Sequence, residues 1–259
     1  MYPLVRIGPF NLSSGGLLLL LAIIIGSTLM ERAARRRGGA TLTDQASRVT
    51  LPAVIGAVIG GRLWYGLLNW DLYGTNPQLF LALRLVDLAW PGALLGGVLG
   101  GWLWCRLRRF DTAAVADAAA LGLLPTQAIA CIGLLLSGEA FGIPTTLPWG
   151  VALFGATRHP TQIYLVLAAL LSFAALHLLG RRPAPAGTLF AAYLLLQGLM
   201  LVLLEPLRAD SLLLPYGVRA AQVAGLGLVL VALVWLRAHV VSAEAPGEQT
   251  GGRLSESGV

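Results

Sequence analysis

Charged residues are scarce in this sequence, and lysine is absent. Asp, Glu and Arg together make up 12% of the 259 residues, about half the share found in an average soluble domain. Hydrophobic residues make up 57% of the chain, and the mean hydropathy is +0.77. This composition excludes an ordinary soluble enzyme, a disordered chain and a domain built on disulfides. It indicates a protein that crosses a membrane several times.

The sequence also has few residues of the types that carry metal, redox or hydrolytic chemistry. Its two cysteines, Cys105 and Cys131, lie in apolar stretches and have neither metal-binding nor redox spacing. His159 and His177 are too far apart to form a ligand pair, and His239 lies beyond the last apolar segment, so neither a metal nor a cofactor is expected. A Gly-rich phosphate loop and a Gly-x-Ser-x-Gly elbow are both missing, which excludes a serine hydrolase.

Long apolar runs divide the chain into candidate membrane spans. A bilayer core needs about 20 apolar residues per helix. Seven segments reach that length, at 12–30, 49–70, 88–105, 112–136, 161–179, 187–205 and 219–236. None of them alternates as the strands of a membrane β-barrel would, so the expected fold is an all-α bundle of seven transmembrane helices.

Two further segments are assigned by their length and composition. Residues 78–86 are apolar but too short to cross a bilayer, and they are predicted to form a helix along the interface. Residues 1–241 are expected to form one transmembrane domain. Residues 242–259 are polar and rich in glycine, and they are predicted to form a disordered tail.

The arginines predict the orientation of the spans. Clusters follow the first, third, fifth and seventh segments, at Arg32, Arg35, Arg36 and Arg37, at Arg106, Arg108 and Arg109, at Arg181 and Arg182, and at Arg237. The connections on the other side hold single arginines. The positive-inside rule therefore places the N-terminus outside and the C-terminus in the cytoplasm. Since the net charge of +6 is explained by this pattern, nucleic acid is not an expected partner.

One arginine lies in the middle of an apolar segment. Arg62 follows Gly60 and Gly61 near the centre of the second segment. An ionisable residue there costs about 2.5–3.5 kcal/mol on insertion scales and needs a partner or a role. The side chain could extend to an interface, but its central position favours a buried anionic partner. The glycine pair would let another helix or a lipid head group approach closely.

Further polar residues lie at segment ends on the predicted outer side. Glu139 ends the fourth segment, and Arg158 begins the fifth. Glu205 and Arg208 end the sixth segment with a spacing of three residues that allows an ion pair, and Pro206 is expected to disturb the helix there. These residues are either ordinary helix-end charges or a group that converges on a phospholipid head group.

One run of residues and several single positions form a recognisable set. The most specific is the run Arg158–Tyr164, Arg-His-Pro-Thr-Gln-Ile-Tyr. The other positions, in chain order, are Ile7 to Pro9, Gly60 to Arg62, Tyr65, Asp87, Gly133, Gly138, Glu139, Gly142, Gly187, Glu205, Arg208 and Gln222. From about residue 2 to residue 236, their order and spacing resemble the prolipoprotein diacylglyceryltransferase family.

The resemblance implies a lipid-modifying enzyme of the bacterial inner membrane with seven spans. That family moves the diacylglyceryl group of phosphatidylglycerol onto the lipobox cysteine of a secreted precursor. It implies phospholipid, with phosphatidylglycerol foremost, and prolipoprotein as partners. The candidate site for the lipid head group consists of Arg62, Tyr65, Glu139, Gly142, Arg158, Glu205 and Arg208.

The sequence departs from the family pattern at several polar positions. A His-Gly-Gly of the family corresponds to Pro91-Gly92-Ala93, and a Tyr-Gly to Gly15-Gly16. An Arg and an Asn of the fourth span correspond to Cys131 and Leu134, and an Arg of the sixth span corresponds to Leu201.

These departures leave two hypotheses. The main one is a catalytically degenerate homologue that binds phospholipid or serves as a subunit of a membrane complex. The alternative is an active but divergent transferase in which Arg62, Arg158 and Arg208 hold the phosphate.

Overall fold

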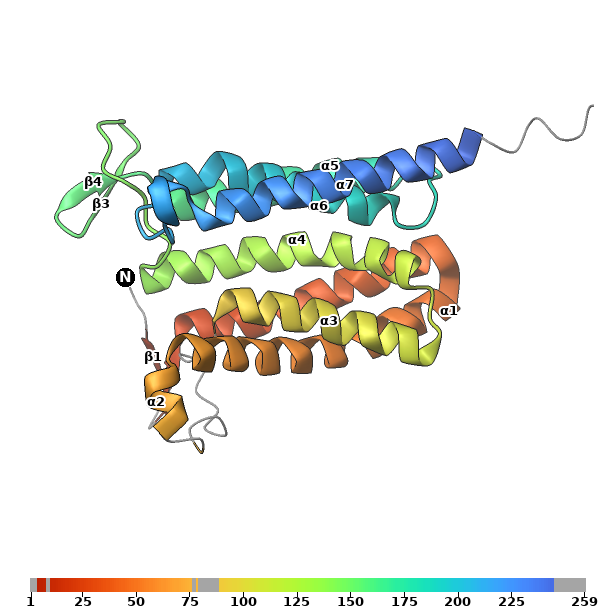
Figure 1. Cartoon of the computed structure of the whole chain (residues 1–259), viewed down its shortest axis with the longest axis horizontal. Helices are drawn as coiled ribbons and strands as arrows, with labels where there is room; N and C mark the ends of the chain where they lie inside the picture. Colours follow the sequence, from red (N-terminus) through yellow and green to blue (C-terminus); the bar gives the residue numbers. More distant parts are fainter. Residues whose placement is uncertain (1–3, 8–9, 76–77, 79–88, 245–259) are drawn as a thin grey trace, which may run out of the picture. The chain divides into compact units, whose positions relative to one another are not determined.

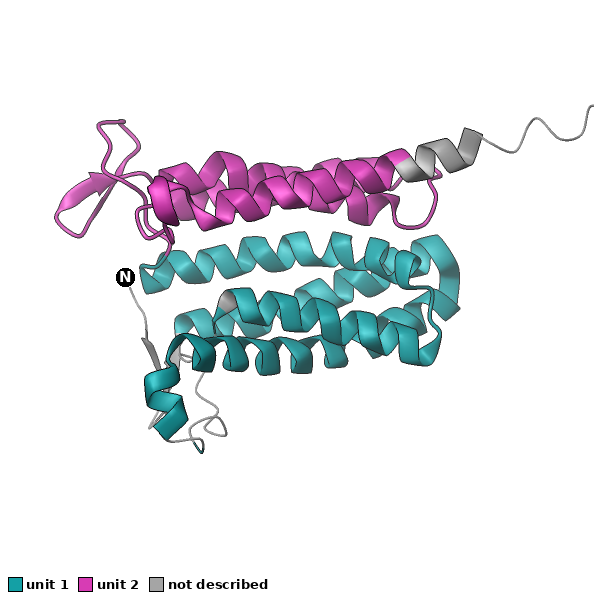
Figure 2. Ribbon diagram, in the orientation of Figure 1, with its two compact units in different colours: residues 1–139 teal, residues 140–259 magenta. Residues whose placement is uncertain are grey.

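The computed structural model describes residues 4–7, 10–75, 78 and 89–244. The chain divides into two compact units, Met1–Glu139 and Ala140–Val259 (Figure 2). Each unit is a group of helices with a short antiparallel hairpin (Figure 1).

The described residues of unit 1 form four helices and one hairpin. Its elements are β1 (Leu4–Ile7), β2 (Phe10–Ser13), α1 (Ser14–Leu68), α2 (Trp70–Thr75), α3 (Trp90–Arg108) and α4 (Thr112–Ser137). The long helix α1 packs against both α3 and α4.

The part of unit 2 that the structure describes forms three long helices, two short 3-10 helices and the second hairpin. Its elements are β3 (Val151–Leu153), β4 (Ala156–Arg158), α5 (Thr161–Leu179), α6 (Thr188–Leu204), η3 (Glu205–Leu207), η4 (Pro215–Gly217) and α7 (Ala220–Glu244). Helix α6 packs against both α5 and α7. As expected from Pro206, α6 ends at Leu204 and the next residues form the 3-10 turn η3.

The expected all-α membrane fold is confirmed. Among the described residues, five helices are long and apolar enough to cross a membrane, namely α1, α4, α5, α6 with η3, and α7. Helix α1 includes most of the first two predicted spans, and α3 includes most of the third. The number of seven spans and the orientation of the termini stay predictions. The two hairpins were not expected, because strands of three or four residues are too short to show alternation.

Helix α1 is interrupted at two glycines. Gly39 has φ 65° and ψ −151°, a conformation that is essentially restricted to glycine, and Gly38 also leaves the helical region. The backbone is helical on both sides of this break. The arginine-rich stretch that follows the first predicted span is therefore helical, and the chain reverses direction only at Gly38 and Gly39 (Figure 1).

Glycines bring the second half of α1 into backbone contact with α3. A Cβ atom at Gly96 would lie 2.1 Å from the carbonyl oxygen of Gly56. Cβ atoms at Gly60 and at Gly92 would each lie 2.3 Å from the other glycine's carbonyl oxygen. Small residues at intervals of four allow this approach, which strengthens packing where lipid supplies no hydrophobic drive between helices. The sequence analysis allowed either another helix or a lipid head group to approach Gly60, and in the structure helix α3 does so.

The same device joins other helices inside each unit. In unit 1, a Cβ at Gly122 of α4 would lie 2.4 Å from the carbonyl oxygen of Gly26, and the Thr126 hydroxyl donates to the Ala22 carbonyl at 3.1 Å. In unit 2, a Cβ at Gly198 of α6 would lie 2.5 Å from the carbonyl oxygen of Gly225. Small residues therefore lie at the contacts between helices and let their backbones approach closely.

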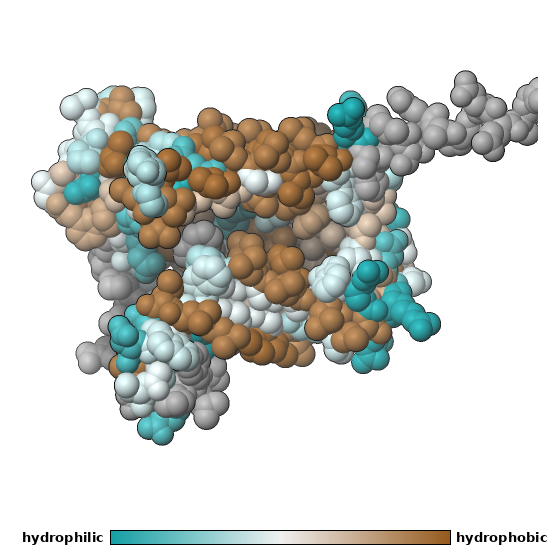
Figure 3. Space-filling model, viewed as in Figure 1, coloured by the Kyte–Doolittle hydropathy of each residue, from teal (hydrophilic) through white to brown (hydrophobic). Residues whose placement is uncertain are grey.

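Large apolar side chains point outward instead. Leu67, Leu171 and Val234 are each about two-thirds exposed or more, at 66%, 71% and 69%. On the face seen in Figure 3, hydrophobic residues cover the helices along much of their length. An apolar surface of this extent suits lipid chains rather than water.

Some predicted segments lie outside the described residues. Apart from residue 78, this applies to the predicted interfacial helix 78–86 and to Asp87. Helix α7 extends to Glu244 and so includes the first three residues of the predicted tail, while 245–259 are outside the described part.

The glycine contacts give the first prediction. The substitution Gly96→Ala forces a methyl group against the Gly56 carbonyl and should lower stability by about 1–3 kcal/mol, as overpacking does. Thermal unfolding of the purified protein in detergent measures this. The matched control is Gly227→Ala in α7, because no atom lies within 4 Å of a Cβ there. It should leave the thermal midpoint unchanged or raise it slightly. Equal midpoints for both variants would contradict the packing argument.

Candidate functional site

A short three-stranded arrangement forms the centre of the site in unit 2. The segment around Gly142 pairs on one side with the chain near Arg208, through Ile143 N to Leu207 O and Ala209 N to Phe141 O, both at 2.9 Å. On its other side it pairs with the end of β4, through Thr145 N to Thr157 O at 2.8 Å and His159 N to Ile143 O at 3.1 Å. Three segments far apart in the sequence therefore meet at Gly142.

Gly142 has to be glycine because of the strand beside it. A Cβ atom there would lie 2.3 Å from the carbonyl oxygen of His159 and 2.6 Å from its Cβ. The lack of a side chain at this position lets the loop after α4 lie directly against the segment that leads into α5. Gly142 is thus a packing residue at the middle of the site.

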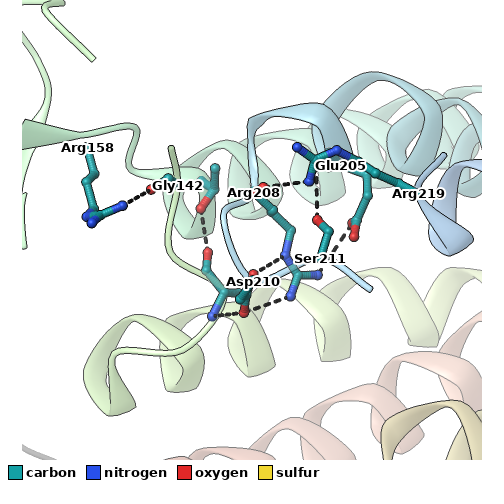
Figure 4. A network of polar contacts seen from close by, with 9 residues as sticks. Gly142, Arg158, Glu205, Arg208, Asp210, Ser211 and Arg219 are labelled. Atoms are coloured by element: carbon teal, nitrogen blue, oxygen red, sulfur yellow. Dashed lines mark hydrogen bonds and ion pairs between the residues drawn. The ribbon is translucent and has the colours of Figure 1, made fainter. Parts of the chain in front are cut away.

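Arg208 is held by two carboxylates (Figure 4). Its guanidinium contacts Asp210 in a bidentate manner, with Nε to Oδ1 at 3.0 Å and Nη2 to Oδ2 at 3.1 Å. The Nη1 atom lies 3.5 Å from Oε2 of Glu205, which is 5% exposed. The predicted ion pair between Glu205 and Arg208 is confirmed. Asp210, which the sequence analysis did not single out, is the stronger partner of the two.

The same network fixes the loop after α4. Oδ2 of Asp210 accepts the amide N–H of Ala140 at 3.1 Å. Ala140 has φ 54°, a left-handed conformation that costs a non-glycine residue about 1–2 kcal/mol. Arg219 adds a bond from its Nη1 to the Arg208 carbonyl at 2.7 Å (Figure 4). The carboxylate of Asp210 therefore links the end of η3 to the strained loop.

Arg158 is placed differently from Arg208. Its Nε donates to the Leu153 carbonyl at 3.1 Å, and its Nη1 donates to the Gly142 carbonyl at 3.2 Å (Figure 4). The guanidinium lies over the Phe141 ring at 5.3 Å. Within the described chain, all these partners are neutral. Arg158 is partly exposed and keeps its positive charge available to an anion.

The residues after Arg158 join the site to α5. Pro160 precedes the first turn of this helix, Thr161 donates to the Ala140 carbonyl, and Gln162 is fully buried. The His159 ring nitrogen Nδ1 lies 3.4 Å from the Tyr164 hydroxyl. That hydroxyl also accepts Trp149 Nε1–H at 2.8 Å. The run Arg158–Tyr164 therefore connects β4, the loop at Ala140 and helix α5 through hydrogen bonds.

Two other predicted site residues come together in unit 1. Arg62 is 6% exposed, and its guanidinium lies 5.5 Å from the ring centroid of Tyr73 in α2. The Tyr73 ring in turn makes an edge contact with Tyr65 at 6.0 Å. This burial argues against an arginine that extends to the interface, and the expected anionic partner of Arg62 stays a prediction. Tyr73 itself was missed because the sequence places it outside any predicted span.

A buried ion pair in unit 1 was also missed. The carboxylate of Asp117 in α4 is fully buried and lies 3.1 Å from Nη2 of Arg37, just before the break in α1. Arg37 had been assigned only a role in membrane orientation. The signal was present, since a lone Asp within an apolar span needs a partner.

The predicted set is therefore divided between the units. Gly142, Arg158, Glu205 and Arg208 meet in unit 2, and Arg62 and Tyr65 meet in unit 1. Glu139 is the last residue of unit 1, where its amide donates to the Leu134 carbonyl at 3.0 Å. Among the described residues, no three His, Cys, Asp or Glu side chains are grouped as metal ligands.

The helices, their apolar surface and the buried charges define a polytopic helical membrane protein. The sequence profile of the prolipoprotein diacylglyceryl transferase family matches residues 3–238. The chain belongs to this family, and it is a multi-pass protein of the bacterial inner membrane, as the sequence predicted.

Similar proteins carry the name phosphatidylglycerol–prolipoprotein diacylglyceryl transferase. One from Nostoc sp. is 34% identical over 212 residues, which cover 74% of this chain and 75% of the relative. One from Gloeobacter violaceus is 35% identical over 214 residues, 74% of this chain and 77% of the relative. One from Clostridioides difficile is 31% identical over 197 residues, which cover 76% of this chain and 78% of the relative.

The Asp210 network gives the second prediction. The substitution Asp210→Asn removes the charge that holds Arg208 and the Ala140 loop, and it should lower stability by about 1–3 kcal/mol. Thermal unfolding in detergent again provides the measurement. Asp44→Asn is the control, since it removes a carboxylate from an exposed pair with Arg48 and should change stability by about 0.5 kcal/mol or less. Similar effects of the two substitutions would show that Asp210 has no special role.

Proposed function

We propose that this protein transfers the diacylglyceryl group of phosphatidylglycerol to the lipobox cysteine of a prolipoprotein. The observation that supports it most is the run Arg158–Tyr164, which folds into one hydrogen-bonded network with Gly142. The family match and the names of the relatives favour the same reaction. This is the alternative of the two hypotheses that the sequence allowed, now taken as the first.

The reaction is a substitution at carbon. The cysteine sulfur forms a bond to the glyceryl carbon that carries the phosphate, and the bond from that carbon to the phosphate oxygen breaks. The phosphoglycerol leaves with the electron pair, and the thiol proton passes to a base. Such a step requires a cation near the leaving phosphate and a proton acceptor near the thiol.

Arg158 is the residue of unit 2 that suits the phosphate. Its guanidinium donates to the carbonyl oxygens of Leu153 and Gly142, which are neutral, so its charge is not cancelled by a carboxylate of the described chain. Arg208 is less suited, because Asp210 and Glu205 already neutralise it. We therefore assign Arg208 to positioning of the Ala140 loop and Arg158 to the leaving group.

His159 is the candidate for the proton acceptor. It is adjacent to Arg158 in the chain, partly exposed, and oriented by the Tyr164 hydroxyl at 3.4 Å. Imidazole is the most frequent general base at neutral pH, and an orienting hydrogen bond is the usual support for that role. The hydroxyl is itself held by Trp149, so the ring is part of a fixed chain of contacts.

A second candidate function is phospholipid binding without transfer. Cys131, Leu134 and Leu201 stand where the resemblance implies Arg, Asn and Arg, and Cys131 is buried. Loss of several groups that act together typically costs many orders of magnitude in rate. A role as a subunit of a membrane complex, also expected from the sequence, has no specific observation in its favour.

The third prediction tests transfer directly. Purified full-length protein in detergent is given phosphatidylglycerol with a labelled diacylglyceryl group and a lipobox peptide, and the thioether product is measured. We expect turnover with the Cys peptide and none with a Cys→Ser peptide. Arg158→Gln should lower the rate by about 10- to 100-fold, because one charge-assisted contact is lost. His159→Asn should lower it by about 100- to 10,000-fold.

Two controls make the result interpretable. Arg181→Gln removes an exposed arginine after α5 and should leave the rate unchanged. Arg62→Gln tests the buried cation of unit 1 in the same assay, with thermal unfolding as a check that the variant is folded. A folded wild-type protein that retains phosphatidylglycerol but forms no product would reject transfer in favour of the second candidate.

A further inference from the structure

Exposed arginines gather at the end of unit 1 where α1 is interrupted. The seven members of this group, here called the arginine end, are Arg32, Arg35, Arg36, Arg48, Arg106, Arg108 and Arg109. The first three precede the break at Gly38 and Gly39, while Arg106 and Arg108 lie in the last turn of α3 and Arg109 follows it, before α4. In Figure 1 the break and this junction lie at the same end of the unit.

The register of the glycine contacts supports this placement. Gly60 meets Gly92, Gly56 meets Gly96, and Pro52 meets Gly100, so α1 and α3 are antiparallel and advance together in steps of four. Continued by one and two turns, the register sets residues 44–48 of α1 beside residues 104–108 of α3. The ion pair of Arg37 with Asp117 links the break to the start of α4.

Two of these arginines are paired with tryptophans one turn earlier in α3. The Arg106 guanidinium lies 5.7 Å from the Trp102 ring centroid, and the Arg108 guanidinium lies 4.7 Å from that of Trp104. Tryptophan is typical of the membrane–water interface, and a guanidinium stacked on indole keeps its hydrogen-bonding edge for an anion. The contact with the tryptophan rings fixes the direction of the guanidinium groups. A role in setting the membrane topology would not require such fixed directions.

Of three nearby carboxylates, one pairs with a member of the arginine end and two have partners outside it. Asp44 binds Arg48, Asp117 binds Arg37, and Asp111 accepts the Ala114 amide as the N-cap of α4. The arginine end therefore keeps a positive excess. Leu103 and Leu107 on the same turns of α3 are 51% and 68% exposed, so apolar surface adjoins the cations.

We propose that Arg106 and Arg108, with their tryptophans, form a binding site for the head group of an anionic phospholipid. The phosphate would accept the guanidinium donors, while the acyl chains would lie on Leu103 and Leu107. This site belongs wholly to unit 1 and shares no residue with the Arg158 network. It does not depend on the proposed transfer.

The test compares lipid retention by the full-length protein. Native mass spectrometry in detergent, with added dioleoyl phosphatidylglycerol or dioleoyl phosphatidylcholine, gives the number of bound lipids and their apparent affinity. We expect a preference for phosphatidylglycerol in the wild type. The double substitution R106Q/R108Q should weaken binding of one phosphatidylglycerol by about 10- to 100-fold.

Two further variants separate the possible causes. The matched control R181Q/R182Q removes the same charge from exposed positions after α5 and should bind like the wild type. R106K/R108K keeps the charge but loses bidentate donors, and it should give an intermediate affinity. Equal losses in both Gln variants, or full affinity in R106Q/R108Q, would overturn the site. Arg158→Gln should leave this lipid bound, so a failure of the transfer proposal would be recognised separately.

Discussion

Close approach of helix backbones at glycine is the constraint on which unit 1 depends. Between helices in lipid there is no hydrophobic drive, so packing, hydrogen bonds and backbone proximity have to provide the association. The contacts of Gly56 and Gly60 with Gly92 and Gly96 meet this requirement and leave the leucines to face outward. They also fix the register of α1 against α3, and through it the position of Arg62 near one end of the pair and of Arg108 near the other.

In unit 2 the corresponding constraint is a network of polar contacts around Arg208. Arg208 bridges Glu205 and Asp210, and Asp210 in turn holds the amide of Ala140 in a left-handed turn. Glu205 is buried, whereas Arg208 and Asp210 are partly exposed, and each of the three is held by the next. The network positions the loop that carries Gly142, and Gly142 positions Arg158 through its carbonyl. The position of the partly exposed Arg158 therefore depends on the ion pairs of Arg208.

The parts of this structure that were predictable are those that follow from local spacing or from burial cost. Apolar length predicted the helices, and the interval of three residues predicted the pair of Glu205 and Arg208. The cost of a charge in an apolar segment argued against an Arg62 that extends to an interface, and Arg62 is buried, while its anionic partner stays a prediction. The contact of Asp210 with the Ala140 amide and that of Tyr73 with Arg62 were not predictable in this way, because the sequence pattern does not encode the course of the chain that brings these partners together. An interruption between the first two predicted spans was expected, but not its place at Gly38 and Gly39, because a glycine pair is common and only the dihedral angles of Gly39 distinguish it.

The chemical capacity of an arginine in this protein is decided by its partners rather than by its exposure alone. Arg208 and Arg37 form ion pairs with carboxylates and have a structural role. Arg158, Arg106 and Arg108 are held by carbonyls or aromatic rings, which orient the guanidinium without cancelling its charge. A phosphate gains most from a cation of the second kind, since its donors are already directed and no ion pair has to be broken first. The absence of lysine is consistent with this division, because a rigid guanidinium can be oriented by neutral partners more readily than a flexible ammonium.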